Sequence, residues 1–198
     1  MRLRLPLLLC AGLLSACGAE GEQTGAGGPA RPTATSPAAV VVAPAAPVAA
    51  PAALTPEGIG PLKIGMTPEA AADAGAPLAF QAGYAPERES CVYGRSDALP
   101  GVRVMVENQR VARVDLEPGS AVTTDKGLGL GATAAAVRAA YGDSIEQSGH
   151  KYVESPAAYL ENWNRDRSRG VRYETDREGR VTAVYAGGQA VNYIEGCA

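Results

Sequence analysis

The sequence is poor in the residues on which enzyme and metal chemistry most often depends. It has one histidine, His150, and four cysteines among 198 residues. A tetrahedral zinc site needs three or four nitrogen or sulfur ligands, which one histidine and a pair of disulfide-bonded cysteines cannot supply. No Gly-x-Ser-x-Gly turn occurs, so a nucleophile would need His150 as its base. We therefore expect no catalytic residue, no metal and no cofactor, and a protein that is not an enzyme.

An excess of basic residues is also missing. Lysine and arginine number 18 against 21 aspartates and glutamates, a formal net charge of −3. Binding to nucleic acid depends on a positive patch that neutralises phosphates. The composition therefore predicts no nucleic-acid partner.

The apolar run at the N-terminus, 5–14, is too short to cross a bilayer, which takes roughly 20 residues. Arginines precede it and Ser15-Ala16-Cys17 follows it, which is typical of a secretory signal over 1–16. The segment Leu14-Ser15-Ala16-Cys17 resembles the bacterial lipobox, whose cysteine is acylated. The alternative is a secretory peptide with an incidental cysteine.

A lipidated Cys17 predicts a cell-envelope protein anchored in the lipid bilayer, because two or more acyl chains hold a protein stably. The next residue is Gly18, which by the sorting of such proteins favours the outer membrane, facing the periplasm. The rest of 17–53 is rich in Gly, Ala and Pro and lacks aromatic residues. Such a segment cannot bury enough surface to fold, so we expect a disordered tether.

The remaining cysteines predict one disulfide. Cys10 lies in the signal segment and Cys17 carries the lipid, which leaves Cys91 and Cys197 in an oxidising compartment. The alternative is two free thiols, one of them a nucleophile.

Two similar helix starts indicate an internal repeat within 54–198. Ile64-Gly65-Met66-Thr67 and Leu130-Gly131-Ala132-Thr133 each end in a threonine that can cap a helix. Each is followed by alternating strands, with hairpins over 102–116 and 171–185. We predict an α+β fold of two helix-then-antiparallel-strand repeats, about 56–120 and 121–198, which form one curved sheet with short helices on one face.

Shorter segments are less distinct. The residues 91–93, 151–153 and 191–194 are further strand candidates. Helix and strand both fit 155–163, and the alternation of Tyr159, Glu161 and Trp163 favours a strand.

The paired helix starts, each followed by a β-meander, resemble the fold group of the beta-lactamase inhibitory protein repeats and the small lipoprotein of the outer-membrane barrel-assembly machinery. The resemblance covers most of 56–186. It implies a module that binds proteins, and it assigns no role to individual residues.

An uneven distribution of aromatic residues suggests where a partner would bind. Six of the eight tyrosines and the only tryptophan follow residue 140. Tyr173 and Tyr185 share strand faces with valines and are expected in the core. Tyr and Trp are common at binding surfaces. We expect exposure of Tyr159 and Trp163, beside a loop whose arginines suit anionic groups. The candidate binding surface is therefore Tyr159, Trp163, Arg165, Arg167 and Arg169.

Three functions remain open. The leading hypothesis is a non-catalytic domain that binds an envelope protein or other envelope component. The second is a domain that binds cell-wall glycan, with Tyr159 and Trp163 stacking on sugars. The third is a small hydrolase that uses two carboxylates from the acidic residues of the second half, Glu154, Glu161, Glu174 and Glu195.

Overall fold

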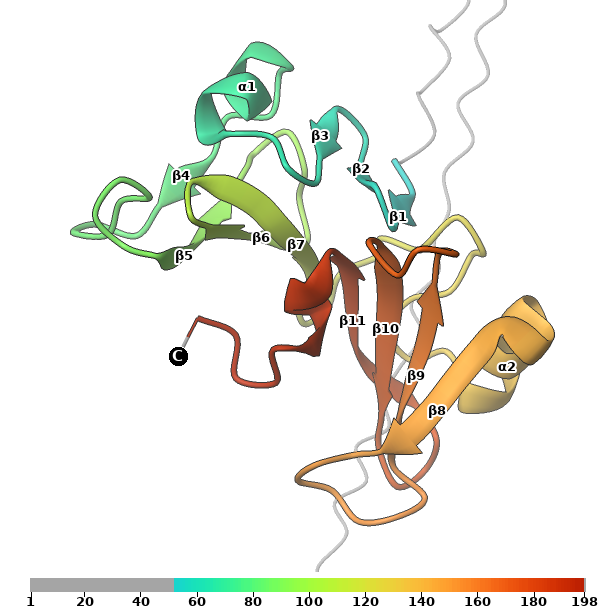
Figure 1. The fold of residues 1–198 in the computed structure, drawn as a ribbon. Coiled ribbons are helices and arrows are strands. Elements are labelled where there is room, and N and C mark those ends of the chain that lie inside the picture. Colours follow the sequence, from blue (N-terminus) through green and yellow to red (C-terminus); the bar gives the residue numbers. More distant parts are fainter. Residues whose placement is uncertain (1–51, 198) are drawn as a thin grey trace, which may run out of the picture. The chain divides into compact units, whose positions relative to one another are not determined.

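An eight-stranded antiparallel sheet dominates the computed structural model, which describes residues 52–197 (Figure 1). The strand order is β4–β5–β6–β7–β11–β10–β9–β8, and a separate small sheet has the order β1–β2–β3. The signal segment 1–16, Cys17 and the tether as far as residue 51 lie outside the described residues. The predictions made for them therefore stay predictions.

The elements follow one another along the chain with short connections. The strands of the small sheet are β1 (Leu54–Thr55), β2 (Gly58–Ile59) and β3 (Leu62–Lys63). The strands of the large sheet are β4 (Ala79–Phe80), β5 (Cys91–Arg95), β6 (Val102–Glu107), β7 (Arg110–Leu116), β8 (Ile145–Gly149), β9 (Ala158–Trp163), β10 (Gly170–Thr175) and β11 (Val181–Gly187). The helices are α1 (Pro68–Asp73) and α2 (Ala134–Tyr141), with 3₁₀ turns at Gly142–Ser144 and Gln189–Asn192.

The expected antiparallel sheet with short helices is confirmed, but the protein is mostly β rather than evenly α+β. Both helices begin at the predicted caps. Thr67 Oγ1 accepts a hydrogen bond from Ala70 N at 3.2 Å, and Thr133 Oγ1 accepts one from Ala136 N at 3.0 Å. The helices have only six and eight residues.

Both halves of the described chain have the same order of elements. Helix α1 precedes β4–β7, and α2 precedes β8–β11. The last strands of the two halves pair at the centre of the sheet, where Asp115 of β7 lies opposite Tyr185 of β11. The sheet is strongly twisted, so β5–β7 run from side to side in Figure 1 while β9–β11 run nearly vertically.

The same irregularity occurs in β7 and in β11. Met105 pairs with Arg113, but Val106 pairs with Val111, so Ala112 is an extra residue. In β11, Thr182 is extra in the same way, between Val181 and Ala183. A bulge of this kind reverses the alternation of side chains.

The bulge in β11 overturns the prediction that Tyr185 fills the core. Val181 is buried with Val184 and Ala186 in the apolar cluster, whereas Tyr185 lies on the opposite face. Tyr173 has no exposed surface and belongs to that cluster, as expected. Counting by twos from Val181 gave the wrong face because it could not include the extra residue.

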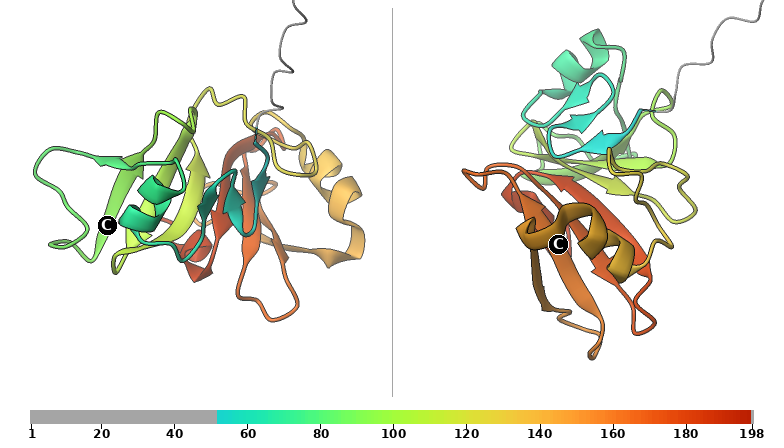
Figure 2. Two further views of the ribbon diagram at one scale, coloured as in Figure 1. Left: turned by 90° about the horizontal axis from the view of Figure 1, so that it is seen from above. Right: turned by 90° about the vertical axis from the view of Figure 1, so that its right-hand side faces the viewer.

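One apolar cluster lies between the large sheet and the elements that cover it. It includes Leu54 of the small sheet, Ala71 of α1, Val137 of α2, and Val104 and Val184 of the large sheet. Figure 2 shows α1 over the first half of the large sheet, and the small sheet lies where the two halves meet, with β2 against β7 and β1 against β11. The opposite face of the large sheet is thus left for polar side chains.

Among the shorter strand predictions, those for 151–153 and 191–194 are wrong, and the one for 91–93 is confirmed by β5. The segment 151–153 forms a bend, because the backbone N–H groups of Tyr152 and Val153 donate to His150 Nδ1 instead of to a strand. The residues 191–194 begin within the 3₁₀ turn Gln189–Asn192 and belong to no strand. Both edges of β11, the strand before them, are already paired, with β7 and β10. The strand prediction for 155–163 is confirmed by β9.

Candidate functional site

The face of the large sheet opposite the helices carries most of the buried charge. We call it the polar face. It consists of alternate side chains from β5–β7 and β9–β11, namely Tyr93, Arg103, Arg113, Asp115, Tyr159, Glu161, Arg172, Glu174 and Tyr185. The bulges place these residues, because they turn Arg113, Asp115 and Tyr185 away from the core.

A buried ion pair lies at the centre of the polar face. Arg113 Nε donates to Asp115 Oδ1 at 2.6 Å, and both side chains are only 2% exposed. Arg103 Nη2 also approaches Asp115 Oδ2, at 3.2 Å. Two guanidinium groups therefore share one carboxylate. Burial acts to lower the pKa of Arg113, but Asp115 outweighs it, and the pKa is raised.

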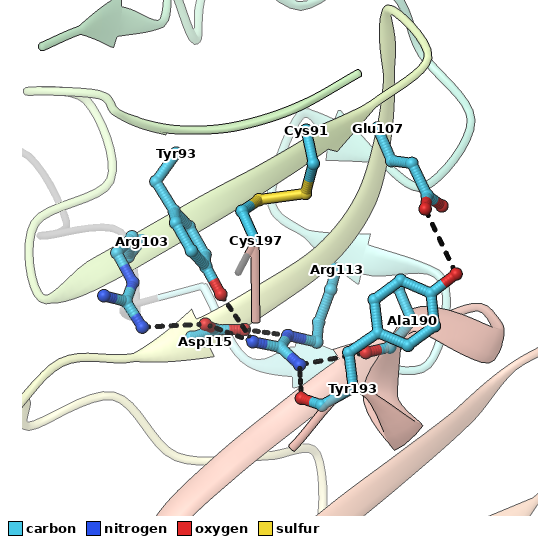
Figure 3. Close-up of a disulfide and its surroundings, with 9 residues drawn as sticks. All are labelled: Cys91, Tyr93, Arg103, Glu107, Arg113, Asp115, Ala190, Tyr193 and Cys197. Carbon is cyan, nitrogen blue, oxygen red and sulfur yellow. Dashed lines mark hydrogen bonds and ion pairs between the residues drawn. A yellow bond between two sulfur atoms is a disulfide. The ribbon is translucent and has the colours of Figure 1, made fainter. Parts of the chain in front are cut away.

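The last residues of the chain cross this ion pair. We call 188–197 the strap. Arg113 Nη1 donates to the carbonyl oxygens of Ala190 and Tyr193, at 2.9 and 2.8 Å (Figure 3). Its Nη2 donates to Tyr93 Oη at 2.6 Å, and its guanidinium lies 4.4 Å from the centroid of the Tyr185 ring. Arg113 therefore fastens the strap to the sheet.

Further contacts hold the strap along its length. The predicted disulfide between Cys91 and Cys197 is present, with its Cα atoms 5.3 Å apart, and joins the end of the strap to β5 (Figure 3). Tyr193 Oη donates to Glu107 at 3.1 Å, and Arg172 Nη2 donates to Asn192 at 2.9 Å. The strap thus spans strands from both halves of the sheet.

Each half contributes an arginine stacked on a tyrosine of the neighbouring strand. Arg103 lies 4.0 Å from the centroid of Tyr93, and Arg172 lies 4.4 Å from that of Tyr159. The two pairs occupy corresponding strands, β5–β6 and β9–β10. Guanidinium–ring contacts of this kind hold both groups in place.

The second half closes its pair with a carboxylate. Arg172 Nε donates to Glu161 Oε1 at 2.5 Å, and the side chains of Arg172 and Glu161 are 8% and 13% exposed. Glu161 also accepts a hydrogen bond from Trp163 Nε1 at 3.1 Å.

The only histidine of the sequence, His150, lies largely buried beside this cluster. His150 Nε2 lies 3.7 Å from Glu174 Oε2, and its ring contacts Tyr159 at 4.6 Å between centroids. Burial raises the pKa of Glu174, although His150 and Arg172 act in the opposite direction. Glu174 Oε1 has no hydrogen-bond partner among the described residues.

The five predicted surface residues separate into three groups. Tyr159 is 4% exposed, so its expected exposure is wrong: Arg172 and His150 cover its ring. Trp163 is half-buried and packs over Gly170, and Arg167 lies 5.2 Å from its ring centroid. Arg165 is exposed and Arg169 is half-buried. Trp163 and Arg167 therefore lie together at one end of the polar face, without Tyr159.

The most important residues of the polar face were missed as candidates. Arg103, Arg113 and Asp115 are charged residues within strands that otherwise read as valine-rich. That pattern is ordinary for a strand with one solvated face. The signal available was the presence of both signs of charge on neighbouring strands, which permits pairing but does not require burial.

Two kinds of feature are absent from residues 52–197. No group of three or more His, Cys, Asp or Glu side chains within 52–197 is placed to hold a metal ion. None of the helices in this part of the chain is long and apolar enough to cross a membrane.

No protein-family model matches the sequence, and the searches of characterised proteins and of solved structures found no match either.

Proposed function

We propose that this chain is a lipid-anchored protein of the bacterial cell envelope whose folded domain binds a protein partner without catalysis. The N-terminal signal with Cys17 and the proline-containing tether support the anchoring and the envelope location. The polar face of the sheet supports binding. The outer membrane, facing the periplasm, is the location that Gly18 favours.

In the same proposal, the domain is a tandem repeat like those of the beta-lactamase inhibitory protein group. Its support is the repeated order of elements and the repeated backbone contacts. Gly65 N donates to Val111 O at 2.7 Å, and Gly131 N donates to Val181 O at 2.8 Å. In both halves the segment before the helix thus bonds to the residue beside the bulge.

One observation carries the binding proposal: the guanidinium of Arg167 lies 5.2 Å from the centroid of the Trp163 ring, at one end of the polar face. Trp, Tyr and Arg are the residues that contribute most to protein interfaces. Trp163 and Arg167 are both already held in place. Trp163 Nε1 donates to Glu161, and Arg167 O accepts a hydrogen bond from Gln189 Nε2 at 2.6 Å. A surface ordered before binding loses little entropy when the partner arrives.

The glycan-binding alternative receives less support. Sugar stacking needs an aromatic ring with one free face, and the ring of Tyr159 is covered by Arg172 and His150. Trp163 alone would have to serve.

The hydrolase alternative also receives less support. Glu161 is paired with Arg172 and Trp163, which leaves it little capacity as an acid or base. Glu195 is hydrogen-bonded to Tyr152, and Glu154 pairs with Arg177.

The proposal is tested with the full-length lipidated protein in a bacterial host, by chemical crosslinking in cells followed by purification. The variant W163A/R165E/R167E should lose the partner that the wild-type protein captures, because it removes the aromatic surface and reverses the charge beside it. A matched control, R138E/R177E, reverses two exposed arginines elsewhere in the same half and should retain the partner. Equal capture by all three proteins would overturn the proposed surface.

A further inference from the structure

The first half of the sheet lacks a carboxylate at a position where the second half has one. In β9–β10, Glu161 stands opposite Arg172 and accepts from its Nε. In β5–β6, Gly94 pairs with Val104, so the next residues outward, Arg95 and Arg103, oppose each other. The first half thus has an arginine where the second half has the glutamate. Like charges directly opposite on paired strands repel each other.

Arg103 accordingly lacks the partner that Arg172 has. Its Nε, the atom that corresponds to the bonded Nε of Arg172, is buried and has no hydrogen-bond partner among the described residues. A buried polar group without a partner destabilises the folded protein. The Arg103 side chain as a whole is 40% exposed, so a ligand can reach other parts of it.

The charge around Arg103 is also positive. Arg103 and Arg113 share the single carboxylate of Asp115. Arg95 pairs with Glu117, but the Arg95 side chain is 65% exposed, and ion pairs this exposed contribute little. Asp97, which lines the same groove as Arg95 and Arg103, is the one further carboxylate there, and it forms no ion pair with either arginine among the described residues.

A groove lies directly over these residues. Its volume is about 620 Å³, and the residues that line it include Gln81, Tyr93, Arg95, Asp97 and Arg103. The groove is large enough for a few residues of an extended chain. Tyr93 supplies an aromatic wall and the two arginines supply the donors.

We propose that this groove binds a carboxylate side chain from an acidic segment of the partner protein. The ligand's carboxylate takes the place that Glu161 takes in the second half and pairs with Arg103 and Arg95. Arginine–carboxylate pairs are commonly bidentate, which fixes the orientation of the bound segment. This inference rests on the proposed function, since it names the chemistry of the partner.

The decisive variant is R95E, which supplies the missing carboxylate from the protein itself. It should fill the position opposite Arg103 and compete with the ligand. The probe is a fluorescent hexaglutamate peptide, titrated into the full-length protein in detergent micelles and followed by fluorescence anisotropy. R95E and R103Q should each weaken binding by about tenfold or more. The variant R180Q, which removes an exposed arginine of the second half, should bind as the wild-type protein does.

Several outcomes would overturn the inference. Hexaglutamate that does not bind, or that binds R95E as tightly as wild type, would do so. Equal binding of a hexaglutamine peptide or of a polyphosphate would show that the groove does not select carboxylates. An N–H correlation spectrum of the arginine Nε groups adds a second readout, in which the Arg103 signal should shift on peptide binding and the Arg172 signal should not.

The two proposals fail separately. If the partner is captured in cells and lost in W163A/R165E/R167E, but R95E captures it normally, binding to a protein stands and the groove is refuted. If hexaglutamate binds the groove but no partner depends on either surface, the proposed function is refuted.

Discussion

Arg113 and Asp115 are the most deeply buried charged side chains among the described residues. Their burial comes from the strap, which covers a face of the sheet that water would otherwise reach. Every N–H group of the Arg113 guanidinium donates a hydrogen bond to Asp115, to Tyr93 or to a carbonyl oxygen of the strap. The cost of removing both charges from water is thereby offset by pairing and hydrogen bonds.

Removing the shared carboxylate should therefore be costly. The variant D115N leaves Arg113 buried without its counter-charge, and we expect a loss of about 3–5 kcal/mol in the free energy of unfolding, measured by urea denaturation. D97N, which alters an exposed aspartate that lines the groove, should change it by less than about 0.5 kcal/mol. A loss below about 1 kcal/mol for D115N would contradict the assigned role.

Glu174 should make stability depend on pH. Because burial raises its pKa in the folded state, the folded protein holds this proton more tightly than the unfolded chain does. The ionised carboxylate therefore lowers stability at neutral pH, and this effect disappears as the pH falls below the pKa of an unfolded glutamate. His150, Arg172 and Arg113 face the group and reduce the effect without reversing it.

The variant E174Q removes this ionisation. We expect it to be more stable than wild type at pH 7 by about 1 kcal/mol or less, and to show no advantage near pH 4. Urea denaturation across that range measures both. The exposed Glu178 provides the control E178Q, for which no such trend is expected. Lower stability of E174Q at pH 7 would refute the assignment.

At the scale of elements, the two bulged strands organise each half. The bulge lets the valine beside it stay in the core and offers its backbone groups to the segment before the helix. Val111 N donates to Met66 O, and Val181 N donates to Ala132 O, both at 2.8 Å. These bonds bring Thr67 and Thr133 to the starts of their short helices.

The contribution of each helix cap to the free energy of unfolding should then be measurable. Helices of six and eight residues have little stability of their own, so each depends on its cap and its packing. T133A should lower the free energy of unfolding by about 1 kcal/mol, because Ala136 N loses its acceptor. T133S retains a hydroxyl and should lose less. Equal losses in thermal or urea unfolding would indicate that packing, not capping, is responsible.

At the scale of the whole molecule, one disulfide links the first half to the end of the chain. Cys91 and Cys197 are 106 residues apart. Closing a loop of this length restricts the unfolded chain, which in the chain-entropy model contributes about 4–5 kcal/mol.

The double variant C91S/C197S should have a free energy of unfolding lower by about 4–5 kcal/mol, measured by urea denaturation. Hydrogen exchange of the strap amides should also become faster, because the end of the strap then loses its covalent link to β5. Unchanged exchange in the strap would mean that Arg113 and Arg172 suffice to hold it without the bridge.

Much of this molecule follows from local patterns in its sequence. The caps at Thr67 and Thr133, the hairpins and the cysteine pairing depend on neighbouring residues or on a count with a single solution, and the structure agrees with them. The signal, the lipid anchor and the tether are likewise read from composition and spacing, and they stay predictions.

Only the tertiary structure decided which charges are buried. Two extra residues, Ala112 and Thr182, reverse the alternation of their strands, and no local pattern marks them. The strap returns to the sheet from the far end of the chain, so the environment of Arg113 depends on residues about 80 positions away. The polar face therefore exists because distant segments meet, and burial of this kind is a property of the folded chain and not of its local sequence.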